Sequence, residues 1–354
     1  MRRTTCNHGI AMKRLLDVLM VTTMLGVFVG GLFFVISWQS PEPHVPYKGV
    51  TLPNGVHIVT SRSWFRLSYF TSETYDAFQR QPVALKWLKA GANSINLEPA
   101  APALGSEPML ILIHGYNAPE SKVGSYFAGA LDLLRSAVGP GTTIIIYDWP
   151  STARHWEELT HQERRAQIDP GGGPRPMPNS MAPINWESRA YRDDMHAARG
   201  HGADGLAALL ALLSWNVPKS ITIIAHSMGA LVTLEALRRP AGATLSIDNI
   251  VLLAPDLPAD ALVDPQNAPV LRRVRRMHVM HSRNDDALWY SQIANKNPRL
   301  GRDGHRGNHP PPPHVTMHDV TDRLGDGIAV HGRYLERDGA SVIGLADVVG
   351  QRSR

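Results

Sequence analysis

Short apolar runs alternate with helix-length stretches along most of this 354-residue chain. Each run is rich in β-branched or other apolar residues and is followed by polar or turn residues, which is typical of a buried strand. Strands that alternate with helices form a parallel sheet with helices on both faces, so the pattern predicts an α/β fold with a mostly parallel central sheet. The expected strands are residues 109–114, 143–147, 221–225, 250–253 and 277–281, with a last one near 314–320. The expected helices are residues 121–137, 189–215 and 229–239.

Two segments interrupt this alternation. Residues 154–187 combine charged residues with the run DPGGGPRPMPNSMAP, and we expect a cap or rim insertion there, where α/β enzymes often carry one. Residues 296–314 are rich in Pro, Gly and His and include His305, His309 and His314. Neither a carboxylate motif nor the HxxxH spacing of a helical metal site joins these histidines. We therefore expect a solvated loop, with no metal and no cofactor; a metal site is the alternative.

The charge and cysteine content exclude several functions. The formal net charge is +5, but the first 17 residues alone carry +3, which leaves only +2 for the rest of the chain. No basic surface of the kind that binds nucleic acid is therefore expected. The only cysteine, Cys6, lies in that first segment, so the remainder has no thiol for a disulfide, a zinc site or a cysteine nucleophile.

The N-terminal segment predicts membrane attachment. Residues 18–38 carry no charged side chain and are long enough to cross a hydrocarbon core of about 30 Å. The apolar region of a cleaved signal is shorter, about 7 to 15 residues, so we expect a retained signal anchor; cleavage and a buried core helix are the alternatives. Basic residues precede this run and Trp38 ends it. This arrangement predicts a cytoplasmic segment at residues 1–17 and a single-pass protein of the inner or cell membrane with an extracytoplasmic domain.

The remaining domain boundaries follow from composition. Residues 39–58 contain Pro and Gly without an apolar period, so we expect a linker between the membrane and the fold. The folded domain is expected over residues 59–340, and residues 341–354 are expected to form a C-terminal tail.

The segment ITIIAHSMGALVTLEAL contains the strongest functional signal of the sequence. A strand-like run enters Ala225 and an apolar-periodic helix follows Ser227, so this serine is expected on a tight turn between strand and helix. The G-x-S-x-G elbow of serine hydrolases requires this context, with small residues two before and two after the serine. Gly229 meets that requirement, and Ala225 replaces the first glycine. Ser227 is therefore the predicted nucleophile; the alternative is a serine that caps the helix.

A second motif precedes the elbow in the chain. The apolar run at residues 109–113 ends in His114 and Gly115. In enzymes with such an elbow, a loop after an earlier strand supplies one backbone amide of the oxyanion hole, and the residue after the nucleophile supplies the other. The predicted donors are the amides of Tyr116 and Met228. Gly115 is expected to let the backbone approach the substrate and His114 to brace the loop; an ordinary strand-ending turn is the alternative.

A serine hydroxyl needs a histidine to remove its proton and a carboxylate to orient that histidine. In enzymes with this elbow, the histidine and the carboxylate both come after the serine in the sequence. His331 has glycines on both sides that permit a close approach to the elbow, and it is the predicted base; His314 and His318 are the alternatives. Three aspartates compete for the role of the acid, in the order of preference Asp285, Asp256 and Asp286.

These motifs together resemble the α/β-hydrolase superfamily, and within it an uncharacterised bacterial branch of lipase-like hydrolases. The shared motifs are HGYN at residues 114–117, WPS at 149–151, AHSMG at 225–229, APD at 254–256 and SRND at 282–285. The resemblance spans about residues 105–336 and implies an eight-stranded, mostly parallel sheet, an acyl-serine intermediate and no cofactor. It also favours Asp285 as the acid, because Asp285 ends the S-x-N-D motif.

The sequence thus predicts a membrane-anchored serine hydrolase that cleaves carboxylic esters, with lipid-like acyl esters among the candidate substrates because of the anchor. A peptidase or amidase with the same residues is one alternative, and a noncatalytic binding protein with the α/β-hydrolase fold is another. Because this fold hosts many reactions, no particular acyl or alcohol group is predicted.

Overall fold

The computed structural model describes residues 56–62, 85–90, 95–98, 105–116, 118, 123, 125–151, 189–215 and 218–350. All of them belong to the second of two units of the chain, Pro46–Arg354. The predicted cytoplasmic segment, the predicted spanning helix at 18–38, the predicted insertion at 154–187 and Asn117 of the HGYN motif lie outside the described residues. Within the described residues, no helix is both long and apolar enough to cross a membrane.

The central feature is a nine-stranded sheet with the strand order β3-β2-β1-β5-β4-β6-β7-β8-β9. The seven strands from β1 to β9 in this spatial order are all parallel to their neighbours. At the other edge of the sheet, β2 pairs antiparallel with both β1 and β3. The mostly parallel α/β sheet predicted from the sequence is therefore confirmed, with nine strands rather than the expected eight. The strands are β1 (Val56–Thr60), β2 (Lys86–Ala90), β3 (Ile95–Glu98), β4 (Met109–Ile113), β5 (Thr143–Asp148), β6 (Ile221–His226), β7 (Ile247–Leu253), β8 (Val274–His281) and β9 (Val315–Asp319).

Strands β1, β2 and β3 were not expected from the sequence. β1 begins at Val56, inside the segment predicted as a linker, so the fold starts before residue 59. Its five residues are too few for a clear alternating pattern, and Pro- and Gly-rich sequence precedes them. The structure identifies β1 as a strand by its parallel pairing with β5, in which Ile58 lies opposite Ile146.

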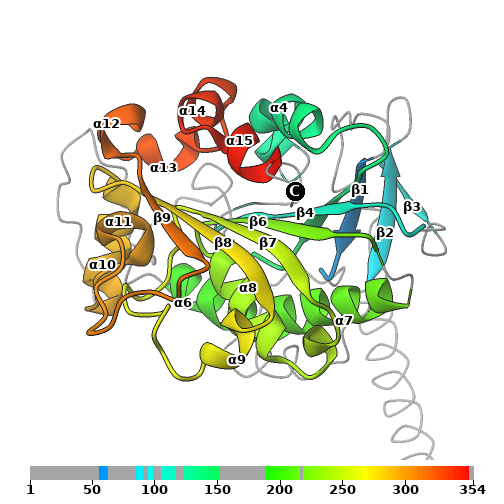
Figure 1. The fold of residues 1–354 in the computed structure, drawn as a ribbon, viewed down its shortest axis with the longest axis horizontal. Coiled ribbons are helices and arrows are strands. Elements are labelled where there is room, and N and C mark those ends of the chain that lie inside the picture. Colours follow the sequence, from blue (N-terminus) through cyan, green and yellow to red (C-terminus); the bar gives the residue numbers. More distant parts are fainter. Residues whose placement is uncertain are drawn as a thin grey trace, which may run out of the picture. The chain divides into compact units, whose positions relative to one another are not determined.

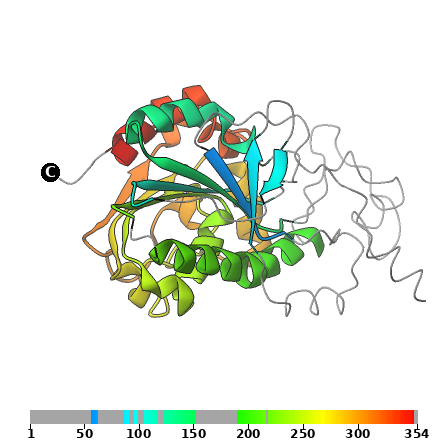
Figure 2. The same cartoon turned by 90° about the vertical axis from the view of Figure 1, so that its right-hand side faces the viewer.

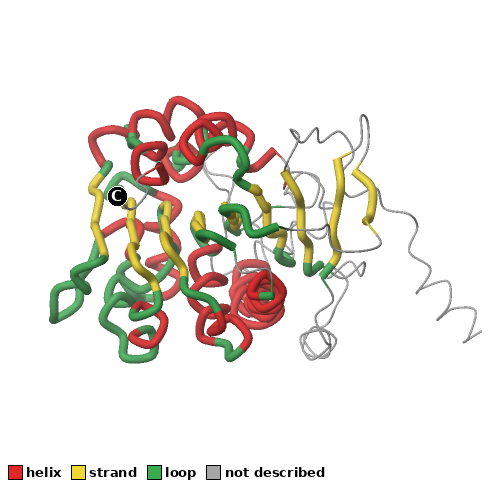
Figure 3. The backbone as a smooth tube through the Cα atoms, turned by 45° about the vertical axis from the view of Figure 1, so that its right-hand side comes forward, coloured by secondary structure: helices red, strands yellow, loops and turns green. Residues whose placement is uncertain are grey.

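Both faces of the sheet are buried, as expected for parallel strands. Successive side chains of β4 point to opposite faces: Met109, Ile111 and Ile113 lie in one apolar core, and Leu110 and Leu112 lie in the other. Figures 1 and 3 show the two helical layers that cover these cores. Because the strands are parallel, their carboxyl ends lie at the same edge of the sheet, which is where α/β proteins bind their ligands.

One helical layer contains α4 (Ala128–Val138) and the C-terminal helices, and the opposite layer contains α6 (Arg189–Ala197), α7 (Ala203–Ser214) and α8 (Gly229–Arg238). Figure 2 shows α7 running along the sheet on the side away from α4. The helix predicted over 189–215 is interrupted at Ala198–Gly202, because Gly200 leaves the helical region with φ −96° and ψ −106°. The remaining helices are α9 (Ala268–Leu271), α10 (Asp286–Asn295), α11 (Leu300–Asp303), α12 (Thr321–Leu324), α13 (Val330–Arg333), α14 (Arg337–Val342) and α15 (Leu345–Gly350).

The C-terminal boundary of the fold lies beyond the predicted residue 340. Helix α15 falls within the segment expected to be a tail, yet Leu345, Val348 and Val349 are buried in the same core as α4. In addition, the side-chain amide of Asn249 donates a hydrogen bond to the carbonyl of Val348 at 3.3 Å. Two short helical turns do not produce a recognisable apolar period in the sequence, which explains the early boundary.

Candidate active site

Ser227 lies on the tight turn between β6 and α8, with a backbone φ of 54°. A non-glycine residue in this left-handed region is strained and persists only where the surrounding structure holds it. Here the amide of Ser227 donates to the carbonyl of Leu253, and the carbonyl of Ser227 accepts from the amide of Asp256. The end of β7 therefore holds the strained turn in place, as expected for a nucleophile elbow rather than for a simple helix cap.

The small residues on either side of this turn differ in the space that surrounds them. A Cβ atom at Gly229 would lie 2.5 Å from the carbonyl oxygen of His114 and 2.7 Å from that of Ile113, so this position requires glycine. Ala225 is fully buried, and its methyl group fits the core beneath the turn. The replacement of the first motif glycine by alanine is thus accommodated.

His331 connects Ser227 to Asp285. Its Nε2 lies 2.9 Å from Oγ of Ser227, and its Nδ1 lies 2.8 Å from Oδ2 of Asp285. A carboxylate only accepts, so Nδ1–H donates to Asp285 and Nε2 is left to accept from the serine hydroxyl. The structure thus brings together the three side chains preferred from the sequence, in the order that activates a serine.

The protonation of His331 reflects two opposing effects. Burial lowers its pKa, but the charge of Asp285, the hydrogen bond to Asp285 and the charge of Asp256 together raise the pKa of His331 above its ordinary value. The carboxylate therefore favours the charged, imidazolium form of His331.

Asp285 also begins helix α10. Its Oδ1 accepts a hydrogen bond from the amide of Leu288 at 3.0 Å, while Oδ2 faces His331. The residue is fully buried, and its backbone forms a bridge with Gly327, which precedes α13. One carboxylate thus caps a helix and orients a histidine, and both contacts fix its position.

The alternative acids have other surroundings. Asp256 is buried and forms an ion pair with Arg299 at 2.7 Å, and it also accepts hydrogen bonds from Tyr191 and Ser291. Burial raises the pKa of Asp256, but Arg299 and these hydrogen bonds outweigh it and lower the pKa below its ordinary value. Asp286 is exposed in the first turn of α10. The contact to Nδ1 of His331 comes from Asp285.

The alternative histidines lie elsewhere. His318 belongs to β9, and its Nε2 is 3.0 Å from Nδ1 of His278 on β8. His314 precedes β9 and accepts a backbone hydrogen bond from Met277. In the Pro-, Gly- and His-rich segment, the Nε2 of His305 contacts the carbonyl of His309 on the surface. Among the described residues, no cluster of His, Cys, Asp or Glu side chains could hold a metal ion.

The predicted oxyanion loop lies directly against the serine. A Cβ atom at Gly115 would be 2.7 Å from Cβ of Ser227, so only glycine allows the loop to come this close. Met228 precedes the first turn of α8, where helix amides have no partner within the helix and the helix dipole favours negative charge. The ring of Tyr116 packs edge-on against Tyr191, with ring centroids 5.6 Å apart.

The sequence from residue 103 to 352 matches the family described as "Alpha/beta hydrolase of unknown function (DUF900)". The chain belongs to this family of α/β hydrolases. The superfamily resemblance noted from the motifs is therefore confirmed. No curated protein matches this hydrolase in sequence.

Several solved structures are similar to this hydrolase at low identity. An uncharacterized protein from Bacillus cereus is 14% identical with a TM-score of 0.32, and the match covers 64% of this chain and 56% of that chain. An acetylxylan esterase is 12% identical with a TM-score of 0.34, over 70% of this chain and 100% of the other. An esterase from Pyrococcus furiosus is 14% identical with a TM-score of 0.30, over 75% and 88%. Similarities this remote do not bear on the substrate.

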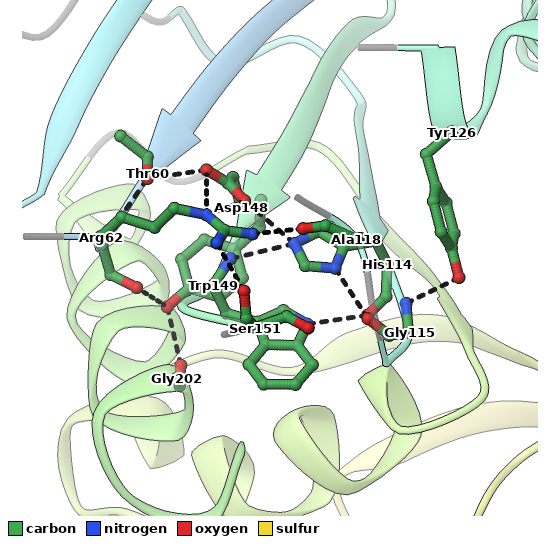
Figure 4. Close-up of polar contacts among 12 residues, drawn as sticks. Thr60, Arg62, His114, Gly115, Ala118, Tyr126, Asp148, Trp149, Ser151 and Gly202 are labelled. Carbon is green, nitrogen blue, oxygen red and sulfur yellow. Dashed lines mark hydrogen bonds and ion pairs between the residues drawn. The ribbon is translucent and has the colours of Figure 1, made fainter. Parts of the chain in front are cut away.

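The hydrolase also contains a buried ion pair, in contact with the loop after β4, that sequence reasoning missed. Arg62 follows β1, and its Nε lies 2.7 Å from Oδ1 of the fully buried Asp148 at the end of β5. The guanidinium also donates to the carbonyls of Ala118 and Ser151, as Figure 4 shows. A single side chain thus ties the loop after β4 to the turn after β5.

His114, which we predict to brace this loop, also joins the network. Its ring stacks on Trp149 at 5.3 Å, and its Nε2 lies 3.0 Å from Oδ1 of Asp148. Its Nδ1 lies 2.9 Å from the carbonyl of Gly115, and the indole of Trp149 donates to the carbonyl of His114 (Figure 4). This fully buried histidine thus contacts both the loop after β4 and the turn after β5.

Proposed function

We propose that this α/β hydrolase is a serine hydrolase that cleaves carboxylic esters through an acyl-serine intermediate. The observation that carries the proposal is the continuous set of contacts from Ser227 through His331 to Asp285 on a strained strand-to-helix turn. A glycine loop packs against the same serine, which is where a second oxyanion donor is needed.

The proposed reaction follows from the positions of the acceptors and donors. Oγ of Ser227 attacks the ester carbonyl carbon as its proton passes to Nε2 of His331, and Asp285 stabilises the resulting imidazolium. The carbonyl oxygen becomes an oxyanion that faces the amides of Met228 and Tyr116. When the C–O bond breaks, the leaving alcohol takes the proton from His331. Water, activated by the same histidine, then hydrolyses the acyl-serine and returns the enzyme to its starting state.

Membrane anchoring is part of the proposal. It is supported by the uncharged run at residues 18–38 and by the basic residues that precede it. In that arrangement the catalytic domain faces the extracytoplasmic side, where lipid-like acyl esters are accessible substrates. Reporter fusions at the C-terminus test this orientation, and a cytoplasmic signal would contradict it.

The central test is labelling of the full-length protein with a fluorophosphonate probe, which reacts with activated serines. We expect labelling of the wild type and none of Ser227→Ala, and turnover of chromogenic esters should fall by several orders of magnitude in that variant. Ser136→Ala is the control, because Ser136 lies in α4 and its hydroxyl donates to the carbonyl of Asp132 in the same helix. Esters of increasing chain length and an amide of the same acyl group then separate esterase from amidase activity. A folded wild type that neither labels nor turns over any of these substrates would support the noncatalytic alternative.

A further inference from the structure

His226 and Tyr126 form a hydrogen-bonded bridge between the loop after β4 and helix α13, which carries His331. His226 is the residue before Ser227, and its Nε2 lies 2.7 Å from the carbonyl oxygen of His331. On the other side of the ring, Nδ1 lies 2.8 Å from the hydroxyl of Tyr126. The amide of Gly115 donates to that same hydroxyl at 3.0 Å. Residues far apart in the sequence are thus joined in one chain of hydrogen bonds.

The chemistry of these groups determines the direction of each hydrogen bond. A carbonyl oxygen only accepts, so Nε2 of His226 carries a proton. Burial, together with the nearby His331, lowers the pKa of His226 well below its ordinary value, so the ring is neutral and Nδ1 accepts. The hydroxyl of Tyr126 therefore donates to Nδ1 and accepts from Gly115. Every donor in the bridge has an acceptor.

The bridge connects two parts of the site whose separation matters for the proposed reaction. At one end is the glycine loop against Ser227, and at the other is the backbone of the base. The ring of His226 lies 4.7 Å from the ring of His331, between their centroids, so a neutral His226 adds no charge that would oppose the imidazolium. Because the Gly115 amide already donates to Tyr126, the substrate oxygen must use other amides.

We propose that His226 and Tyr126 are positioning residues that hold the Gly115 loop and the His331 backbone at the separation that ester hydrolysis requires. The proposal rests on the proposed function of Ser227 and His331. It requires His226 to act on two sides, with one nitrogen that donates to His331 and another that accepts from Tyr126. Neither residue touches the reacting atoms.

Single substitutions separate the two sides of the bridge. In His226→Gln the longer amide keeps a donor near the position of Nε2 but loses the contact to Tyr126. In His226→Asn the shorter amide keeps an acceptor near the position of Nδ1 but loses the contact to His331. Tyr126→Phe removes both contacts of the hydroxyl and leaves His226 bonded to His331.

Tyr334→Phe provides the matched control. Tyr334 is fully buried, and the centroid of its ring lies 6.4 Å from that of His226. Its hydroxyl has no hydrogen-bond partner within the part of the chain that the structure describes. The control therefore removes a hydroxyl next to the same histidine without breaking a hydrogen bond.

The kinetic test measures kcat, KM and the pH dependence of kcat/KM for a chromogenic ester. We expect Tyr126→Phe to lower kcat by about 10²-fold with little change in KM, because the oxyanion loop is misplaced. His226→Asn should also lower kcat. Because His331 is then held less closely to Asp285, its pKa should fall, and the decline of kcat/KM at acid pH should move to lower pH. His226→Gln should keep the wild-type acid limb, and Tyr334→Phe should match the wild type in every parameter.

Histidine ring titration by NMR on the full-length protein gives a readout that needs no turnover, with the His331 signals assigned by their loss in His331→Gln. The expected result is a lower His331 pKa in His226→Asn than in the wild type and in Tyr334→Phe. An inactive, unlabelled wild type would refute the proposed function alone, because the titration still tests whether His226 holds His331. If the wild type is active and Tyr126→Phe and His226→Asn match Tyr334→Phe in kcat and in His331 pKa, the positioning proposal is wrong. If His226→Asn fails to fold, Tyr126→Phe alone tests the proposal, and a kcat equal to that of Tyr334→Phe would refute it.

Discussion

Two buried aspartates follow neighbouring strands of the sheet, and their partners differ. Asp256 follows β7 and is 4% exposed, whereas Asp285 follows β8 and is fully buried. Asp256 faces Arg299, a cation that does not lose its proton in proteins. Asp285 faces His331, whose charge changes near neutral pH. Burial and position at a strand end are thus shared features, and the partner alone distinguishes the carboxylate of a buried ion pair from the one that we propose orients the catalytic histidine.

The surroundings of the two carboxylates support this division. Asp256, Tyr191, Ser291 and Arg299 form a buried polar network, in which the side chain of Arg299 is 4% exposed. The side-chain amide of Asn295 also donates to Tyr191 and Ser291. The network joins the end of β7 to α6 and α10, and it lies beside the strained turn through the amide of Asp256. We interpret this network as the support of the site and the Asp285 contact as part of its chemistry.

The largest expected effect comes from Asp285→Asn. The new amide can keep its oxygen on the Leu288 amide, so α10 stays capped, but its NH₂ group then faces Nδ1 of His331. That arrangement selects the histidine tautomer that cannot accept the serine proton, and turnover should fall by about 10⁴-fold with the fold intact. Steady-state kinetics with circular dichroism provide the test. Near-normal turnover in this variant would move the acid elsewhere.

Asp256→Asn should affect stability more than turnover, the reverse of Asp285→Asn. It leaves a buried Arg299 without its counter-charge, so the free energy of unfolding should fall by about 3–5 kcal/mol. Turnover per folded molecule should fall far less than in Asp285→Asn. The matched control is Asp204→Asn, because Asp204 pairs with Arg239 at the same 2.7 Å distance but with side chains 44% and 35% exposed. That loss should be about 0–1 kcal/mol in denaturant unfolding.

The pH profile sharpens the comparison further. His331 acts as a base only when neutral, so kcat/KM should decline as pH falls through a midpoint above the ordinary histidine value. Asp285→Asn should shift this midpoint to lower pH, and Asp256→Asn should shift it by less, because the charge of Asp256 makes the smaller contribution to the raised pKa of His331. Equal shifts in both variants would mean that the two carboxylates are not distinguished by their partners.

The smallest expected effect is that of Asp286→Asn. This aspartate is exposed in the first turn of α10, where its negative charge interacts favourably with the helix dipole. Its loss should change the free energy of unfolding by at most about 0.3–1 kcal/mol and leave turnover unaltered. A large loss of turnover would show that adjacency to Asp285, rather than contact with His331, matters in this segment.

The sequence was informative wherever function and fold depend on local pattern. Ser227 could be selected because strand, turn and helix follow one another within a few residues, and Asp285 because it ends a motif after a clear apolar run. By contrast, Tyr126 and Arg62 lie in no motif. Tyr126 meets His226 across 100 positions, and Arg62 meets Asp148 across 86. Contacts between distant residues arise only from the pairing of strands and helices, which a single sequence does not specify.

The same limit applies to the edge of the sheet. Most residues of β4 to β8 are buried, and each of these strands contains an apolar run that is visible in the sequence. β1 is recognised only through its parallel pairing with β5, and β2 and β3 only through antiparallel pairing at the sheet edge. Their pairing partners rather than their own composition make them strands.

The packing of α15 against α4 has a consequence for biosynthesis. The ribosome has already delivered Ser227, Asp285 and His331 when Leu345 emerges, yet the core beside α4 is still uncovered at that point. Apolar surface exposed during synthesis promotes aggregation. A premature stop codon just after His331 would therefore yield a polypeptide that carries every proposed catalytic group but accumulates as insoluble material.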